Sequence, residues 1–178
     1  GQAYYFDNPR VQVPGEPFRD TGSSDIIAEL ALRAYGNWNI GMGVQWDPGL
    51  TRSEKGDVRI QYKPGVDQVA NLGYRFRRDN IEQVEGSLAW PIGERWNAYA
   101  RMVYSLDDHR SLDQFAGLEY RSCCWRFRLV ARHYVSNRSG DTDTSVLLQL
   151  ELNGLSSVGD DADAFLERSI RGYSPRPA

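Results

Sequence analysis

Asn37-Trp38-Asn39-Ile40-Gly41-Met42-Gly43-Val44-Gln45-Trp46-Asp47 is the stretch that decides the fold of this 178-residue chain. Apolar and polar residues alternate strictly along it. Because successive side chains of a β-strand point to opposite faces, the segment has one apolar face and one polar face. Tryptophan stands at both ends of the apolar face. This pattern is typical of a membrane-spanning strand, with an apolar side towards lipid and aromatic residues at the two membrane interfaces.

The same alternation recurs from residue 26 to residue 152, and charges keep to the polar side. In residues 26–34, for example, Glu29 and Arg33 both lie opposite the apolar positions. An arginine or lysine facing mid-bilayer costs roughly 2–4 kcal/mol, so the separation favours a membrane protein. A soluble sandwich or a lipocalin-like barrel also alternates. Its strands are usually about five or six residues long, however, whereas these segments have about ten.

The alternation predicts nine strands, joined by connections of two lengths. Four connections are tight turns and four are longer and more polar (48–56, 78–82, 107–111 and 136–141). Outer-membrane barrels have short periplasmic turns and longer outer loops. We therefore expect the last strand to end in the periplasm. The nine predicted strands are 26–35, 38–47, 57–63, 66–77, 83–91, 96–106, 112–121, 125–135 and 142–153.

The strand count predicts a fragment of a larger barrel. Bacterial single-chain barrels have even strand numbers, and an unpaired first strand would leave an open edge in lipid. The chain also opens without the basic start and apolar core of a signal peptide. We expect the C-terminal part of an all-β, antiparallel transmembrane barrel in the bacterial outer membrane. Residues 1–25 would form an external loop with the end of a preceding strand, 26–153 the strands, and 154–178 a periplasmic tail with a short helix near 160–171.

The sequence offers little for catalysis, for metal binding or for a cofactor. Its only histidines, His109 and His133, are far apart, and no Cys/His cluster has ligand spacing. Ser105 and Ser111 flank His109 in a predicted loop, where polar residues are expected anyway. We predict that the chain is not an enzyme. A lipid-modifying barrel enzyme remains the least favoured alternative, and it would lose activity when either histidine is replaced.

Three arginines share the polar face of the eighth predicted strand: Arg126, Arg128 and Arg132. The neighbouring strands place Glu119 and Glu151 on their own polar faces. One interpretation is a ladder of cross-strand ion pairs that stiffens the wall. The other is a basic lumenal surface that passes an anionic, phosphorylated substrate. The sequence favours the ladder and leaves both open.

The two cysteines, Cys123 and Cys124, are adjacent. Neighbouring side chains of a strand point apart, so a disulfide between them would be strained. They are either free thiols or bridges to cysteines elsewhere. Because an envelope protein meets an oxidising compartment, we expect each to pair with a cysteine that this chain does not contain.

The same corner carries a family resemblance. Residues 117–125, Gly-Leu-Glu-Tyr-Arg-Ser-Cys-Cys-Trp, resemble the G-x-x-Y-x-S-C-C-[WY] segment of the LPS-assembly outer-membrane proteins, the LptD family. Residues 148–157 resemble that family's last barrel strand and the turn after it. Residues 90–96 and the opening 4–6 are similar as well. The resemblance covers essentially the whole chain, and tandem cysteines at a barrel turn are a specific feature.

The resemblance implies a 26-stranded barrel with a separate N-terminal periplasmic domain, which inserts lipopolysaccharide into the outer leaflet. It implies three partners: lipopolysaccharide, a lumen-plugging lipoprotein (LptE) and a periplasmic bridge protein (LptA). It also implies that each tandem cysteine forms a disulfide with an N-terminal cysteine of the same polypeptide. A general diffusion porin, the main alternative, would need neither cysteines nor a lateral seam.

In this family the lipid leaves through a seam between the first and last strands, so the last predicted strand here would form one side of that exit. The residues implied for the seam are Thr144, Ser145, Val146, Leu147, Leu148 and Gln149.

Overall fold

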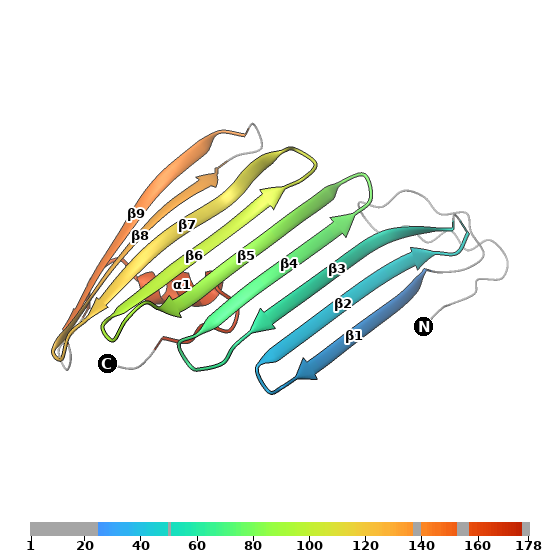
Figure 1. Cartoon of the computed structure of the whole chain (residues 1–178). Coiled ribbons are helices and arrows are strands. Elements are labelled where there is room, and N and C mark those ends of the chain that lie inside the picture. Colours follow the sequence, from blue (N-terminus) through green and yellow to red (C-terminus); the bar gives the residue numbers. More distant parts are fainter. Residues whose placement is uncertain (1–24, 50, 137–139, 153–156, 176–178) are drawn as a thin grey trace.

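The computed structural model describes residues 25–49, 51–136, 140–152 and 157–175, and these form one antiparallel sheet with a helix on one side (Figure 1). Strands neighbour one another in chain order from β1 to β10, with no crossover. The predicted N-terminal loop, residues 1–25, lies outside the described residues apart from Asp25. The elements are β1 (Ile26–Ala34), β2 (Trp38–Asp47), β3 (Arg52–Tyr62), β4 (Val69–Arg77), β5 (Ile81–Pro91), β6 (Trp96–Ser105), β7 (Arg110–Arg121), β8 (Trp125–Val135), β9 (Thr142–Leu152), β10 (Ser157–Gly159) and α1 (Ala162–Ser169).

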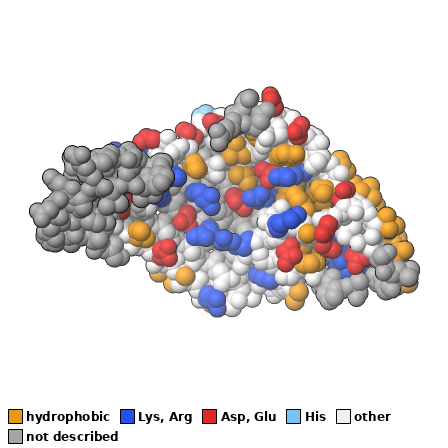
Figure 2. Space-filling model, turned by 180° about the vertical axis from the view of Figure 1, so that it is seen from behind, with side chains coloured by type: hydrophobic (Ala, Val, Ile, Leu, Met, Phe, Trp, Pro, Cys, Tyr) orange, Lys and Arg blue, Asp and Glu red, His pale blue; other side chains and the backbone are white. Residues whose placement is uncertain are grey.

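The strand register gathers the alternating residues on two chemically distinct faces. Leu30 lies opposite Met42, and Leu129 lies opposite both Leu118 and Leu148, so one face is apolar across the whole sheet. This apolar face is exposed: Leu72 shows 55% of its surface and Val146 60%. Exposed apolar area of this extent marks a surface that contacts another apolar phase. The opposite, polar face carries the charged side chains (Figure 2). The prediction of an all-β antiparallel fold is confirmed.

Aromatic rings border the apolar face at the end of the sheet that carries the β1–β2, β3–β4, β5–β6 and β7–β8 turns, here called the turn end. Trp38 and Tyr62 have ring centroids 4.6 Å apart, and Tyr120 lies 4.9 Å from Trp96 and 5.2 Å from Trp125. Along β6, Trp96 and Tyr104 enclose a stretch of nine residues. That length is within the range of about 9–11 residues that a tilted transmembrane strand needs.

The predicted difference in loop length is wrong. β3 begins at Arg52 rather than residue 57, β5 at Ile81 and β7 at Arg110. The connections there shrink to 48–51, 78–80 and 106–109, whereas the turn between β3 and β4 grows to 63–68. Strand pairing continues through polar residues such as those at 52–57, because backbone hydrogen bonds do not require alternating side chains. Loop length therefore does not distinguish the two ends of the sheet.

A tenth strand and a helix occupy residues 157–175, which we call the C-terminal strap. α1 is shorter than the predicted 160–171. The Asp161 side chain accepts a hydrogen bond from Ala164 N at 3.0 Å, which caps the first turn, and Ile170 has extended backbone. In Figure 1 the helix lies behind the sheet, on its polar face. No helix in the described ranges is both long and apolar enough to cross a membrane.

The strap rests on a patch of apolar side chains that interrupts the polar face. Leu166 and Ile170 are completely buried, and Tyr173 is 8% exposed. The rings of Phe165 and Phe115 lie 5.0 Å apart. Burying these side chains removes apolar surface from water, which fixes the strap to the wall. The sheet residues of this core are Val69, Ala89, Tyr99, Phe115 and Val130, with Leu147 packed against them.

Candidate functional site

The two edges of β9 are paired to very different extents. The edge next to β8 pairs along its whole length, from Trp125↔Leu152 to Val135↔Thr142. On the opposite edge, which we call the outer edge, only Gln149, Leu150 and Glu151 pair, and their partner is β10. Within the part of the chain that the structure describes, no strand pairs with the outer edge of residues 142–147. Unpaired backbone groups are not tolerated in hydrocarbon, so a barrel containing this sheet must cover that edge with another segment.

The six residues implied for the seam all lie on β9, but not all on its open edge. Thr144, Ser145, Val146 and Leu147 belong to the open part. Leu148 is already bonded: its carbonyl oxygen accepts from Asp160 N at 2.9 Å, and its N–H donates to Asp160 Oδ2 at 3.1 Å. Gln149 is buried, and its Oε1 accepts from Arg128 Nη1 at 2.9 Å and Ala162 N at 3.1 Å. The last two residues therefore hold the strap.

The three arginines of β8 are ion-paired. Arg128 is 1% exposed; its Nη2 lies 2.5 Å from Glu119 Oε2 and its Nη1 lies 2.8 Å from Asp163 Oδ1 of α1. Arg126 contacts Glu151 at 3.3 Å, and Arg132 contacts Asp113 at 2.8 Å. These groups join neighbouring strands to one another and to the strap. Because Arg126 and Arg128 are buried, they offer no charge to a passing anion.

Glu119 is the centre of this network. Its carboxylate is completely buried and accepts hydrogen bonds from Asn97 Nδ2 at 3.0 Å, Tyr99 Oη at 3.0 Å and Arg121 Nη2 at 2.8 Å, besides those from Arg128. The Tyr99 ring also packs edge-on against Tyr173 of the strap, with centroids 5.4 Å apart. The fixed charge of Glu119 thus links β6, β7, β8 and the strap.

A second group of arginines, which the sequence analysis missed, lines a hollow of about 410 Å³ between β1 and β6. Figure 2 shows basic side chains across the middle of the polar face. Among the described residues no carboxylate pairs with Arg33, Arg75 or Arg171, whereas Arg59 lies 2.7 Å from Asp57. Gly41 and Gly73 line the same hollow and add no side chains to it. Glycines on the polar side of neighbouring strands, next to arginines, were the sequence signal for this feature.

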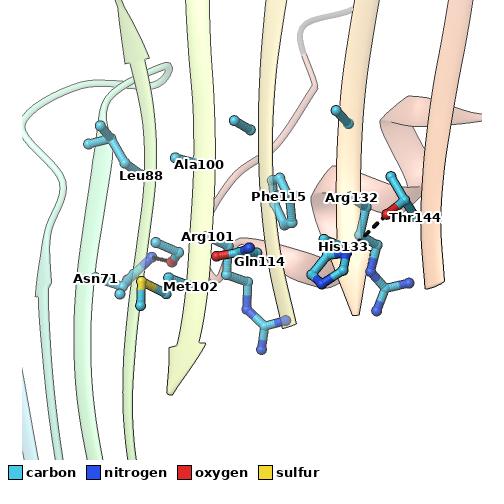
Figure 3. A pocket seen from close by; sticks show the side chains of 14 residues that line it. Asn71, Leu88, Ala100, Arg101, Met102, Gln114, Phe115, Arg132, His133 and Thr144 are labelled. Atoms are coloured by element: carbon cyan, nitrogen blue, oxygen red, sulfur yellow. Dashed lines mark hydrogen bonds between the residues drawn. The ribbon is translucent and has the colours of Figure 1, made fainter. Parts of the chain in front are cut away.

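A shallow hollow of about 690 Å³ runs over β4–β9 beside two rows of apolar-face residues (Figure 3). Ala100, Ala116 and Ala131 form one row. The other includes Gln114, His133 and Thr144, where His133 Nδ1 lies 2.9 Å from Thr144 Oγ1. A single histidine bonded to a hydroxyl, without a carboxylate to orient it, is not a hydrolytic triad.

In the described part of the chain, no hydrogen bond joins the other histidine, His109, to a serine or a carboxylate. His109 lies in the loop between β6 and β7 at φ +52°. Ser105 Oγ bonds to Asp108 Oδ2 at 3.1 Å, a contact that caps this loop. Across the described ranges, no cluster of three or more His, Cys, Asp or Glu side chains is arranged to hold a metal ion.

Cys123 and Cys124 form the turn between β7 and β8, at the turn end of the sheet. Both are exposed thiols, and their sulfurs lie 2.7 Å apart. The hydrogen bond between the two sulfurs lowers the pKa of Cys123 and raises the pKa of Cys124. A lower pKa increases the thiolate fraction at neutral pH and therefore the reactivity of Cys123.

This difference predicts the order of alkylation in reduced protein. At pH 7, iodoacetamide should modify Cys123 several-fold faster than Cys124, as followed by mass spectrometry of the peptide in Cys123→Ser and Cys124→Ser variants and in the parent chain. As pH rises above both pKa values, the two rates in the parent should converge. Equal rates at pH 7 would contradict the arrangement of the two thiols.

Comparison with known proteins gives one consistent result. The family model described as LPS transport system D, LptD, matches residues 1–96. The LPS-assembly protein LptD of Nitrosococcus oceani is 39% identical over 173 residues, covering 97% of this chain and 23% of the relative. Those of Aromatoleum aromaticum and Pseudomonas aeruginosa are 37% and 30% identical, covering 97% and 99% of this chain.

The chain spans about a quarter of the length of these curated relatives, 22–24%. Its sheet is accordingly a fragment of a larger barrel. A family model that covers more than half of the chain, together with relatives matched along nearly all of it, confirms the resemblance stated from the Ser-Cys-Cys-Trp corner. This chain belongs to the LptD family, LPS transport system D.

Proposed function

We propose that this chain forms the last nine transmembrane strands of an outer-membrane barrel that inserts lipopolysaccharide into the outer leaflet, with the open edge of β9 as one side of a lateral exit. The relatives are named as LPS-assembly proteins. Their name supports lipopolysaccharide as the cargo and transport, rather than catalysis, as the role. The exposed apolar face with its aromatic border supports the place in a membrane.

The observation that carries the exit is the half-covered edge of β9. β2 to β8 are each paired on both sides, as a closed wall requires. Among the described residues, only the short strand β10 pairs with the outer edge of β9, and residues 142–147 are left for another segment. A lipid with a large polar head can leave a barrel sideways only where two strands part. A short overlap lowers the number of hydrogen bonds to be broken there.

The polar face supports a lumen that admits a charged saccharide. Arg33, Arg75 and Arg171 line a hollow with no carboxylate paired to them among the described residues, and phosphorylated sugars bind arginine well. The same face would hold the partners of the complete protein. We propose a lumen-plugging lipoprotein, LptE, against this wall and a periplasmic bridge protein, LptA, docked to an N-terminal domain of the same polypeptide.

We also propose that the turn end of the sheet faces the periplasm and that Cys123 and Cys124 there each form a disulfide with an upstream cysteine. Such links would hold the N-terminal domain under the barrel mouth. In non-reduced full-length protein, peptide mapping should find both residues in long-range disulfides. Two free thiols after isolation would contradict this pairing.

A disulfide across the seam tests the exit. In full-length protein, a cysteine at Ser145 is joined to a cysteine at the facing residue of the first barrel strand. Export of lipopolysaccharide to the cell surface should fall to background, while the barrel stays folded and heat-modifiable. The matched control joins Ser145 to its β8 partner Arg132, and this variant should export normally. The single-cysteine variants account for the loss of each side chain.

A general diffusion porin is the second candidate. It would tolerate both crosslinks, because solutes would pass along the lumen rather than between strands. Normal export by both crosslinked variants would therefore favour the porin over the lateral exit.

A further inference from the structure

The short strand β10 occupies the turn end of the β9 edge. Ser157, Val158 and Gly159 lie opposite Glu151, Leu150 and Gln149, respectively. Beyond them, Asp160 bonds to Leu148 through both its backbone N–H and its carboxylate. Residues 157–160 therefore bond β9 from Leu148 to Glu151, on the side where another barrel strand would have to pair.

The geometry of Gly159 suits this pairing and excludes other residues. Its φ is +108°, a conformation that residues with side chains rarely adopt. A Cβ at this position would overlap the carbonyl oxygen of Leu148. The close approach of the two backbones thus depends on glycine.

The remaining edge is short. The Leu148 backbone points outward to Asp160, and the backbone groups of a strand alternate between its two edges. Outward groups are therefore left only at Thr142, Thr144 and Val146. β9 and β8, in contrast, pair along eleven residues of β9.

The rest of the strap anchors β10. Asp163 lies 2.8 Å from buried Arg128, the Ala162 N–H is bonded to buried Gln149, and Leu166 and Ile170 are fully buried. Further along the strap, the carbonyl oxygen of Gly172 accepts a hydrogen bond at 2.7 Å from Nζ of Lys63, the residue that follows β3. A strand held at this many points remains beside β9 when a competing strand approaches.

We propose that β10 is a built-in competitor for the seam edge. It restricts the closing barrel strand to residues 142–147 and so keeps the seam unpaired at its turn end, where the cargo enters between the strands. This inference rests on the proposed lateral exit. It adds an element, the strap, that limits how far the seam can close.

The test uses full-length protein with a photo-crosslinking residue at position 150, whose register partner in β10 is Val158. With the native strap, the crosslinked peptide should contain Val158. In Gly159→Ala the clash should expel β10, so that position 150 captures the first barrel strand and lipopolysaccharide export becomes several-fold slower. Gly93→Ala is the matched control, because a Cβ there meets nothing within 4 Å. It should leave both readouts unchanged.

A second release route keeps the test decisive. Leu166→Asp places a charge in the buried anchor and should release the strap even if Gly159→Ala is accommodated. Capture of the first strand at position 150 without slower export, in either variant, would overturn the proposal. So would a released strap with no strand taking its place. If the disulfide from position 145 to the first barrel strand failed to block export, the lateral exit itself would be wrong. That result is distinguishable, because the strand captured at position 150 reports only on the strap.

Discussion

Glu119→Ala should destabilise the folded barrel by about 3 kcal/mol. Removing one member of a buried ion pair typically costs about 3–5 kcal/mol, because the remaining charge is left in a poorly solvated place. Arg128 retains Asp163 at 2.8 Å, which places the expected loss at the lower end. The cost arises from Arg128, Asn97 and Tyr99, which all lose the same acceptor.

The measurement is urea unfolding of the full-length barrel in detergent micelles. Glu119→Gln, which keeps an acceptor oxygen but removes the charge, should fall between the parent and Glu119→Ala. Glu85→Gln is the matched control: its carboxylate also pairs with an arginine, Arg101 at 3.3 Å, but is 45% exposed. Such pairs contribute about 0–1 kcal/mol. Equal losses for Glu119→Ala and Glu85→Gln would contradict the buried network.

Ala100→Arg should cost roughly 2–4 kcal/mol, the penalty for a cation on the lipid face at mid-bilayer. Ala100 lies midway along β6 between Trp96 and Tyr104, the two aromatic ends of its apolar face. Leu88→Arg should cost a similar amount, because Leu88 of β5 lies directly opposite Ala100 in the strand register and therefore at nearly the same depth. The penalty falls towards zero only for positions close to the interface.

The control for the face assignment is Glu85→Arg on the polar face of the adjacent strand. Arg101 keeps Asp113 at 2.9 Å there, so this change should be tolerated far better. The folded fraction can be read from heat-modifiable migration on gels. Similar losses for Ala100→Arg and Glu85→Arg would mean that the two faces have been assigned the wrong way round.

Most of the sheet could be predicted from the sequence, because lipid and water impose opposite requirements on alternate residues. Trp38, Met42 and Trp46 could be assigned to the apolar face without any knowledge of their neighbours. Strand ends outside the apolar band were predicted less well. The polar stretch at 52–57 still pairs as a strand, but its side chains show no alternation to reveal it.

The sequence predicted the short helix of the strap, but it did not reveal β10 or the docking of the strap on the polar face. β10 has only three residues, too few to show alternation, and Gly159 acts through its backbone. A signal did exist on the other side of the contact. Val69, Phe115 and Val130 are apolar residues on the polar face, and each packs in the core under the strap. In an alternating strand, such residues appear to be random exceptions to the pattern unless a helix such as α1 is known to cover them.

For the arginines, the sequence could predict the face of the sheet but not the long-range partners. The sequence placed Arg126, Arg128 and Arg132 correctly on one face, but it could not show that Asp163, 31 residues beyond Arg132, would return to that face and pair with Arg128. Contacts of this kind depend on where the chain goes after the last strand. Arg33 and Arg75, which have no carboxylate partner among the described residues, were equally visible in the sequence, and only the register showed that they line one hollow.

The most direct test of the account is to find where lipopolysaccharide touches the barrel while it is in transit. A photo-crosslinking residue at Ser145, on the polar face of the open β9 edge, should capture pulse-labelled lipopolysaccharide early, and the capture should decay during the chase. The same residue at Leu72, on the apolar face far from β9, should capture only material that persists. Transient capture at Ser145 alone is the predicted result. No transient capture at Ser145, or the same time course at both positions, would contradict an exit at the β9 edge.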